Sequence, residues 1–366
     1  MFKTTCVCCC LGGALLLIGC ASAAPEDDQS DAEVSHSYLT SQAQTTDQSS
    51  DSYSFFVMSD VHGVSGNEST IEKAIAQMKG IDEHAIAGIV SGDLTNYGDS
   101  EWDIHNRLVD KFFDRAATDF DGTKPRYLSA LGNHDVFDYG SNDQKPWIDS
   151  WNDSLTGQSG LGTNSGTSGI YFATSYRNSL FVMLDSEHPS SDQNQALETA
   201  LTSSTADFKF LFWHRPVFPC YDDPHKEPFE AGLPWVDLAE THGVDVVFNG
   251  HTHIYTRTCP KENGICGDSG VVYVETGSLG TSRHRGPNVS TMTTTGTYTD
   301  PNGQVFTETY YNCDERSDSN PNGHLDSKLG NPTNTFCHVR VEGSNGYVDC
   351  YEVGNSAPID SWEITK

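Results

Sequence analysis

The sequence predicts an α/β fold, because short apolar runs alternate with longer segments of helical character between residues 53 and 280. Runs such as FFVM, FKFLFW and DVVFNG are continuous rather than alternating in hydrophobicity. Such runs are typical of strands that are buried on both faces of a sheet. After residue 280, strand-like segments separated by turn residues dominate, so the rest of the chain is expected to be rich in β structure.

The individual elements follow from these patterns in chain order. We expect helices near 68–79, 100–116, 193–202 and 234–242. We expect strands at 53–58, 85–91, 126–131, 169–174, 179–184, 207–213, 244–248 and 271–275.

Two hairpins are expected beyond residue 280. Residues 300–303, with the sequence DPNG, mark a turn between two alternating strands. Residues 335–342 and 346–353 flank the turn sequence GSNG and should pair as a second hairpin. These strands would complete the second sheet of the fold or form a small β appendage.

Five polar motifs each follow an apolar run, at the point where the predicted strand ends. In open α/β sheets, ligands and catalytic groups gather at the carboxyl ends of strands, so distant motifs can converge there. A lone D-x-H or H-x-H is weak evidence, but the five together predict one dinuclear metal site. The motif residues are Asp60 and His62, Asp93, Asn133 with His134 and Asp135, His214, and His251 with His253.

The pattern D-x-H, G-D, G-N-H-D, H and G-H-x-H resembles that of the calcineurin-like metallophosphoesterases, over roughly residues 53–280. The resemblance implies a four-layer α/β/β/α sandwich and hydrolysis of phosphate esters by a hydroxide that bridges two metal ions. It also implies a role for each ligand. Asp60, His62 and His253 would bind one metal, Asn133, His214 and His251 the other, and Asp93 would bridge both.

The residue types suit this chemistry independently of the resemblance. Two metal ions about 3.5–4 Å apart can clamp phosphoryl oxygens and stabilise an in-line displacement. Imidazole, carboxylate and amide ligands without a thiolate suit Fe, Mn, Zn or Co. We expect His134 to protonate the leaving group, with Asp135 orienting its ring and raising its pKa. The alternative is that His134 is only a structural neighbour of the ligands.

Three arginines are candidates for contact with the substrate. Arg215 directly follows a predicted ligand, but an ion pair with one of the many acidic residues is an equally good interpretation. Arg283 and Arg285 lie in the densest positive cluster of the chain, just after a predicted strand. They could bind a phosphate or merely neutralise nearby acidic side chains.

The chain departs from the related purple acid phosphatases at two motifs. That branch carries G-D-x-x-Y, whose tyrosine binds ferric iron, and D-x-G at the first motif. Here Asn96 occupies the tyrosine position, Tyr97 comes one place later, and the first motif is D-x-H. The run WHRP at residues 213–216 does resemble that branch, so the placement within the superfamily stays open.

The amino terminus indicates export. Residues 1–20 read as a signal peptide that ends in LIGC, a sequence resembling the lipobox in which Cys20 becomes lipidated. Residues 21–23 offer a rival A-x-A cleavage site that would release a secreted protein. Residues 21–52 are polar and acidic and are expected to form a disordered linker. The protein is thus expected in a bacterial cell envelope as a lipoprotein, or secreted, with membrane contact only through a lipid anchor.

Charge and cysteine content restrict the remaining possibilities. The net charge is −30, which argues against a track that binds the backbone of a nucleic acid. The even number of cysteines beyond Cys20 favours disulfides over a zinc site in an oxidising compartment. The preferred pairs are Cys259 with Cys266 and Cys337 with Cys350.

Residues 314–332 form a polar segment that contains Asp318, Asn320 and Asn322 at the spacing of a calcium loop. Leu329 stands where an EF-hand needs a glutamate, so a plain surface loop is the preferred interpretation over a structural calcium site.

After the linker, the sequence therefore favours a metallophosphoesterase core at 53–280 and a β-rich completion or appendage of it at 281–366. The expected activity is hydrolysis of small phosphomonoesters. A phosphodiesterase or nucleotidase with the same metals is the first alternative, and a non-catalytic surface-binding lipoprotein is the second. Oligomeric state, metal identity and natural substrate are not determined by the sequence.

Overall fold

The computed structural model places part of the 366-residue chain. The described residues are 52–63, 66–96, 102–115, 117, 119–136, 162–163, 170–219, 229–258, 260–262, 265–266, 269–280, 293–299, 305–312 and 334–366. The signal peptide, most of the linker, the candidate calcium loop, Cys259, Arg283 and Arg285 lie outside them.

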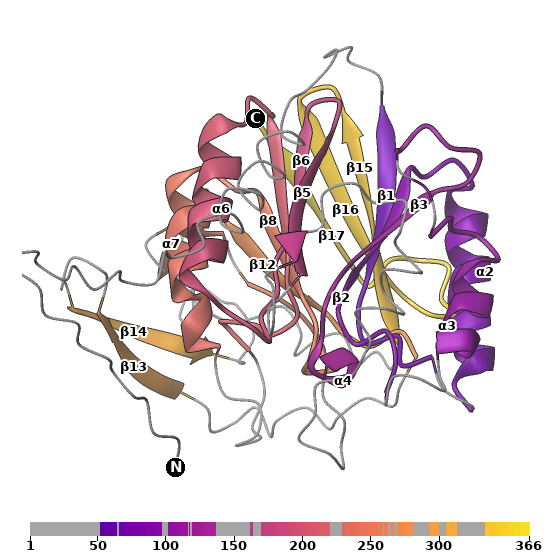
Figure 1. The fold of residues 1–366 in the computed structure, drawn as a ribbon, viewed down its shortest axis with the longest axis horizontal. Helices are drawn as coiled ribbons and strands as arrows, with labels where there is room; N and C mark the ends of the chain where they lie inside the picture. The colour runs from indigo at the N-terminus through magenta and orange to yellow at the C-terminus, as the bar shows by residue number, and fades with distance from the viewer. Residues whose placement is uncertain are drawn as a thin grey trace, which may run out of the picture.

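Two large sheets form the centre of the molecule (Figure 1). The six-stranded sheet has the order β17-β16-β15-β1-β2-β3, and the seven-stranded sheet has the order β4-β5-β6-β7-β8-β12-β9. The first contains β1 (Tyr53–Met58), β2 (Ala87–Ser91), β3 (Arg126–Ala130), β15 (Thr335–Glu342), β16 (Asn345–Glu352) and β17 (Asp360–Thr365). The second contains β4 (Gly162–Thr163), β5 (Ile170–Tyr176), β6 (Ser179–Met183), β7 (Phe208–Phe212), β8 (Val246–Asn249), β9 (Tyr255–Arg257) and β12 (Val272–Thr276).

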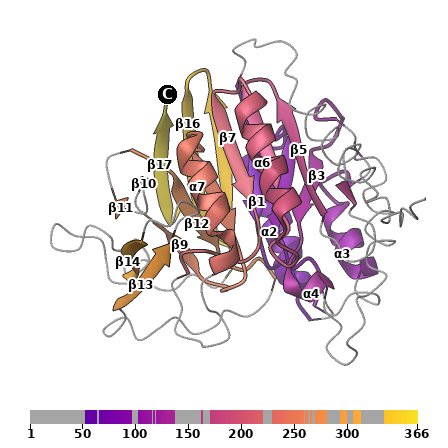
Figure 2. The same ribbon diagram turned by 60° about the vertical axis from the view of Figure 1, so that its left-hand side comes forward.

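Helices cover the outer face of each sheet, which gives the expected four-layer α/β/β/α sandwich. Figure 1 shows α2 and α3 beside β1–β3, and Figure 2 shows α6 and α7 in front of the seven-stranded sheet. The helices are α2 (Glu68–Ile81), α3 (Trp102–Val109), α4 (Asn133–Val136), α6 (Ser191–Ser203) and α7 (Leu233–Thr241), with the 3₁₀ turn η1 (Glu230–Gly232) before α7.

The continuous apolar runs are explained by burial on both faces. All six residues of β1 are buried. Phe55 faces the other sheet, with its ring centroid 5.1 Å from those of Phe181 and Phe210. Phe56 points to the opposite face of the sheet, which α2 and α3 cover. Its ring centroid lies 6.2 Å from that of Phe112. A strand between two apolar layers therefore carries hydrophobic side chains on both of its faces.

Each helix buries one face against its sheet. In α2, Ile71, Ala74, Ile75 and Met78 are the buried residues, at the i, i+3, i+4 and i+7 spacing of an amphipathic helix. Helix α6 begins after Ser190, whose hydroxyl accepts a hydrogen bond from the backbone N–H of Gln193 and so caps the helix.

The carboxyl-terminal strands join the sheet that contains β1 rather than the second sheet. β15 pairs antiparallel with β1, and β16 and β17 follow outward. Cys337 and Cys350 are paired partners in β15 and β16 and form the predicted disulfide. The other predicted hairpin, β13 (Thr293–Thr299) with β14 (Val305–Asn312), is a two-stranded sheet of its own, as is the short pair β10 (Lys261–Glu262) with β11 (Ile265–Cys266).

Several elements differ from the expectation, including the short elements α4, β4, β9, β10 and β11, which were not predicted. The helix predicted at 100–116 ends at Val109, because the backbone of Asp114 turns to bond Pro125 and Tyr127 and so forms a bridge to β3. The strand β17 was not predicted, because its residues are only partly buried and lack a continuous apolar run.

Among the described residues, none of the helices is long and apolar enough to cross a membrane.

A buried histidine holds α3 against the sheet. His105 Nδ1 lies 3.0 Å from the carbonyl oxygen of Leu94, and Nε2 lies 3.0 Å from the hydroxyl of Tyr127. Burial lowers the pKa of His105 to about 3, so the ring is neutral and can donate through Nδ1 while accepting at Nε2.

This network predicts a pH effect on stability. The unfolded chain binds a proton at His105 below about pH 6.5, whereas the folded chain does not, so folding stability should fall by up to about 1.4 kcal/mol per pH unit below that point. Replacement of His105 by Gln removes this contribution. Denaturant unfolding between about pH 6.5 and pH 4 should therefore show the stability of the wild type approaching that of His105→Gln. A difference that stays constant with pH would contradict the assignment.

Candidate metal centre

The predicted ligands all lie at the carboxyl ends of strands in the two sheets. Asp60 and His62 follow β1, and Asp93 follows β2. Asn133 begins α4 just after β3. In the second sheet, His214 follows β7, and His251 with His253 follows β8. The parallel strands of both sheets thus end at one region, where the ligand side chains are buried.

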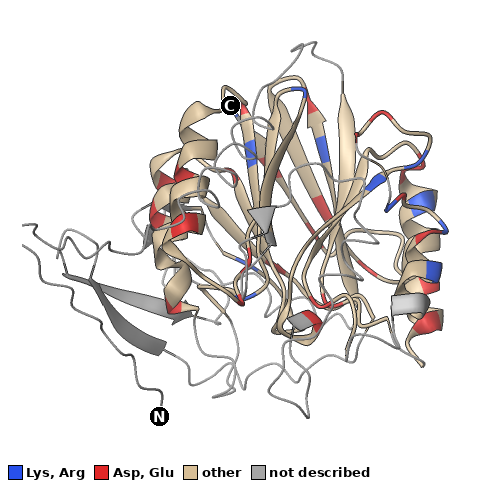
Figure 3. Cartoon of the chain, viewed as in Figure 1, with Lys and Arg blue, Asp and Glu red and all other residues tan. Residues whose placement is uncertain are grey.

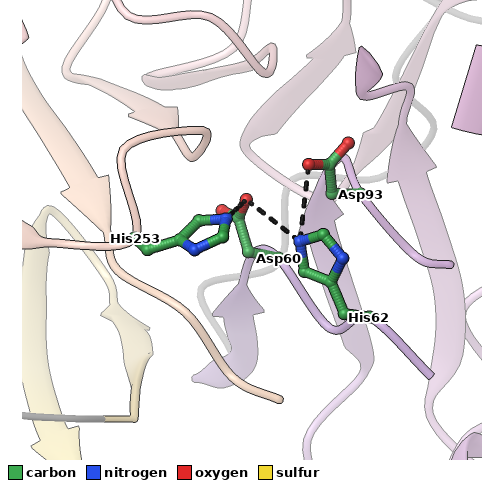
Figure 4. Close-up of side chains that lie close together, drawn as sticks. All are labelled: Asp60, His62, Asp93 and His253. Atoms are coloured by element: carbon green, nitrogen blue, oxygen red, sulfur yellow. Dashed lines mark ion pairs between the residues drawn. The ribbon is translucent and has the colours of Figure 1, made fainter. Parts of the chain in front are cut away.

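Four of the side chains form a tight cluster (Figure 4). Asp60 Oδ1 lies 3.0 Å from Nε2 of His253 and 3.8 Å from Nε2 of His62. His62 Nε2 lies 3.5 Å from Asp93 Oδ2. One candidate ligand atom from each of the four residues lies within 4.8 Å of the others. This spacing allows a single metal ion to contact all four residues.

A second group of ligands lies on the other side of Asp93. The same Asp93 Oδ2 is 3.2 Å from Nε2 of His214, which is also 3.2 Å from the side-chain oxygen of Asn133. The rings of His214 and His251 are 5.0 Å apart. One oxygen of Asp93 therefore faces both groups, as a bridging ligand must.

The donor atoms of the cluster are better suited to metal coordination than to hydrogen bonding with each other. Asp60 Oδ1, His62 Nε2 and Asp93 Oδ2 are buried, and within the described part of the chain none has a hydrogen-bond partner of normal geometry. Leaving buried polar atoms unpaired is costly, at about 1–3 kcal/mol each. Metal coordination satisfies such atoms, and these nitrogen and oxygen donors suit divalent ions.

Neighbouring charges favour the ionised form of the two aspartates, which is the form that binds metal. Burial alone would raise the pKa of Asp93, but His214 and His62 outweigh it and hold the pKa well below its usual range. Asp60 is likewise kept ionised by His253 against the effect of burial. In the absence of metal, Asp93 raises the pKa of His214 to about 9, although burial opposes this shift. Metal binding there would displace protons from the histidines.

The backbone at the ligands is strained. Of the non-glycine residues with positive φ in the described ranges, all but Arg177 are predicted ligands, namely Asp60, His62, Asp93, His251 and His253. Left-handed geometry costs about 1–3 kcal/mol for such residues. This conformation orients the side chains of the five residues toward a common region, which explains why the strain is retained.

Two glycines are required by close approach. A Cβ at Gly132 would overlap the carboxylate of Asp93, and one at Gly250 would overlap the side chain of Ser59 and lie 2.5 Å from Asp60 Oδ2. The glycines of the G-N-H-D and G-H-x-H motifs thus make room for the carboxylate ligands.

The comparison with known families agrees with this geometry. The sequence profile of the calcineurin-like phosphoesterase family matches residues 53–255. The chain belongs to this family. The family is one of phosphoesterases, and the Asp and His cluster of this chain agrees with a dinuclear centre for divalent metal ions.

One solved structure supports the fold, and a second is similar. The chain is similar to a purple acid phosphatase from yellow lupin seeds, with 17% identity, a TM-score of 0.58, and 88% of this chain and 55% of that chain covered. It thus spans about half the length of the lupin enzyme. It is also similar to a dimetal phosphatase from Danio rerio, with 14% identity, a TM-score of 0.49, and coverage of 86% and 98%. No curated protein matches the chain. At these identities the likeness extends to the fold alone.

The phosphoesterase site positions His134 differently from the sequence-based expectation. His134 Nδ1 lies 2.9 Å from the carbonyl oxygen of Asn96, the residue that stands in place of the tyrosine of purple acid phosphatases. Its backbone N–H donates to Asp93 Oδ1 at 2.9 Å, and its ring lies 4.9 Å from that of His62. The ring is therefore beside the metal ligands and oriented by a carbonyl group.

The expected role of Asp135 was wrong in its details. Its carboxylate accepts hydrogen bonds from the backbone N–H groups of Leu94, Thr95 and Gly132, so it joins two ligand loops instead of orienting His134. The expected rise in the pKa of His134 is also not found, because burial lowers it. Burial raises the pKa of Asp135 to about 7.

Arg215 forms an ion pair with an acidic residue, which the sequence offered as the alternative to a substrate contact, but the partner is a buried glutamate that the sequence did not specify. Its guanidinium binds the carboxylate of Glu187, and its Nη1 lies 3.3 Å from Nε2 of His251. Glu187 follows β6 in the segment Asp185 to His188, so it too stands at the carboxyl end of a strand. The sequence did contain a signal for Glu187, because this polar segment follows a sixth apolar run. The segment matches none of the family motifs, however.

The shared oxygen of Asp93 predicts how metal content responds to mutation. Asp93→Ala should remove both ions, whereas His253→Ala should reduce the content by one ion per chain, since His253 lies on one side only. Elemental analysis after dialysis measures this stoichiometry. His84→Ala, at an exposed histidine before the amino end of β2 and so at the strand end opposite Asp93, is the control. A protein that keeps two ions after loss of Asp93 would exclude the bridging role.

Proposed function

We propose that this metallophosphoesterase hydrolyses small phosphate monoesters. The observation that carries the proposal is the position of Arg215, whose permanent positive charge lies beside the second group of ligands at His251. A phosphate monoester carries about two negative charges at neutral pH, one more than a diester, and gains more from an added cation. Guanidinium groups also match phosphate oxygens geometrically.

The side chains near the cluster have separable roles in this proposal. Metal ions bound by the seven ligands would supply Lewis acidity and an activated water molecule, with Fe, Mn, Zn or Co as the candidate metals. His134 Nδ1 lies against the carbonyl oxygen of Asn96, a contact that orients the ring, and the protonated ring would be the proton donor to the leaving group. Asp135 ties the loop of Asp93 to that of His134 and so fixes the distance between them.

The surface charge supports a small substrate over a nucleic acid. Helices α6 and α7 carry Asp and Glu but neither Lys nor Arg in their described sequences (Figure 3). A face of this kind repels a polyanion. A phosphodiester or nucleotide substrate with a short chain is the alternative outcome of the experiment below.

The proposed proton transfer predicts a dependence on the leaving group. A general acid contributes about 10²- to 10⁴-fold, and less when the leaving group needs no proton. His134→Ala should therefore reduce kcat for phenyl phosphate about a hundredfold or more, and kcat for 4-nitrophenyl phosphate much less. The rates are measured with each candidate metal, and His84→Ala serves as the matched control.

Two results would revise this proposal. Faster turnover of bis(4-nitrophenyl) phosphate than of the monoester by the wild type would make a phosphodiesterase the better assignment. An equal loss for both monoesters in His134→Ala would remove His134 as the proton donor.

We propose in addition that the protein is exported and lipidated at Cys20. The disulfide between Cys337 and Cys350 supports export, because disulfides persist in oxidising compartments. Metabolic labelling with a fatty acid in a bacterial host should mark the wild type and leave Cys20→Ala unlabelled. Labelling of neither protein would favour cleavage after residue 23 and release.

A further inference from the structure

The ion pair between Arg215 and Glu187 has the geometry of a positioning contact. Arg215 Nε lies 2.9 and 3.1 Å from the two oxygens of Glu187, and Nη2 lies 2.9 Å from Oε2. One edge of the guanidinium, formed by Nε and Nη2, is thus fixed by one carboxylate. Nη1, on the remaining side, lies 3.3 Å from Nε2 of His251. The guanidinium plane is therefore fixed relative to a metal ligand.

The two partners differ in exposure. The side chain of Glu187 is 1% exposed, whereas that of Arg215 is 30% exposed. A buried carboxylate needs a charged partner, because desolvation of an unpaired charge is costly. The exposed portion of Arg215 is the part of the pair that solvent, and hence a dissolved phosphate, can reach.

The segment that carries Glu187 is itself held rigidly. Asp185 Oδ1 accepts hydrogen bonds from the backbone N–H groups of Glu187 and His188 at 2.8 and 3.2 Å. The buried side chain of Gln193, in the first turn of α6, accepts from the N–H of Asp185 and donates to its carbonyl oxygen. These contacts anchor the carboxylate to the end of β6 and the start of α6.

The backbone of Arg215 is fixed on both sides as well. Its N–H donates to the hydroxyl of Ser186 at 3.1 Å, and its carbonyl oxygen accepts from Nε1 of Trp213 at 2.9 Å. The loops after β6 and β7 are thereby joined. An arginine held at its backbone and along one edge of its guanidinium loses little further freedom when an anion binds.

We propose that Glu187 is a positioning residue that fixes Arg215 as the phosphate-binding side chain beside the second metal position. The inference rests on the proposed function, because it assigns part of the phosphate affinity to this pair. An ion pair that only joins two loops is the competing explanation. If Glu187 is a positioning residue, its loss should lower phosphate affinity only when Arg215 is present. If the ion pair only joins two loops, its loss should not change phosphate affinity.

A double-mutant cycle separates these explanations. Binding of inorganic phosphate to the metal-loaded protein is measured by calorimetry for the wild type, Glu187→Gln, Arg215→Ala and the double variant. Glu198→Gln, on the exposed side of α6, is the matched control for loss of one carboxylate in this region. Metal content and melting temperature are measured for every protein, and kcat and KM are measured with a phosphomonoester.

The expected result is a loss of phosphate affinity of about tenfold or more in Arg215→Ala, since a charge-assisted hydrogen bond to phosphate is lost. Glu187→Gln should lose affinity by several-fold and raise KM more than it lowers kcat. In the Arg215→Ala background, the loss of Glu187 should have no further effect on phosphate binding. Glu198→Gln should match the wild type.

Additive effects, or an unchanged phosphate affinity in Glu187→Gln, would overturn the proposal. If Glu187→Gln does not fold, Arg215→Lys tests the same point, because a lysine keeps the charge but not the fork that pairs with Glu187. Wild-type affinity in Arg215→Lys would then contradict the need for a fixed guanidinium. A wild type that binds phosphate but does not hydrolyse monoesters would reject the proposed function without affecting this test.

Discussion

The contact of one Asp93 oxygen with histidines on two sides sets the geometry of the whole site. His62 approaches this oxygen to 3.5 Å and His214 to 3.2 Å, although the two histidines belong to different sheets. Both sheets must therefore end at the same level. The packing of Phe55 against Phe181 and Phe210 between the sheets fixes their relative position, so the hydrophobic core also controls the distances between metal ligands.

Convergence of the ligands requires local conformations that a chain would otherwise avoid. Five ligands have positive φ, and Asp60 and Asp93 are buried as anions. Asp and His tolerate left-handed geometry better than most residues, which reduces the cost. The surrounding hydrogen bonds, such as those that Asp135 accepts from two loops, hold the turns in place. The strain is thus distributed over rigid strands whose burial stabilises it.

The polar residues around the ligands form a second set of constraints. The carbonyl of Asn96 orients His134, and Glu187 holds Arg215, so each side chain with a proposed contact to substrate is fixed by a partner from a different loop. Hydrolysis depends on accurate placement of such groups, because most of the rate advantage comes from positioning and preorganised charge. The same arrangement explains why the site uses the ends of β2, β3, β6, β7 and β8 together.

The sequence by itself predicted the strands that lead to the site and the seven candidate ligands, because both depend on local patterns: a continuous apolar run followed by a polar motif. It also favoured the pairing of Cys337 with Cys350, which the structure confirms, since these cysteines lie in adjacent strands of a short hairpin. Only the tertiary structure decided the partners of Asp135, Arg215 and His134. A carboxylate can accept from many donors, and its choice depends on which loops the two sheets bring together. For the same reason, the addition of β15–β17 to the sheet of β1 could not be read from the sequence, because edge pairing between distant segments leaves no local signal.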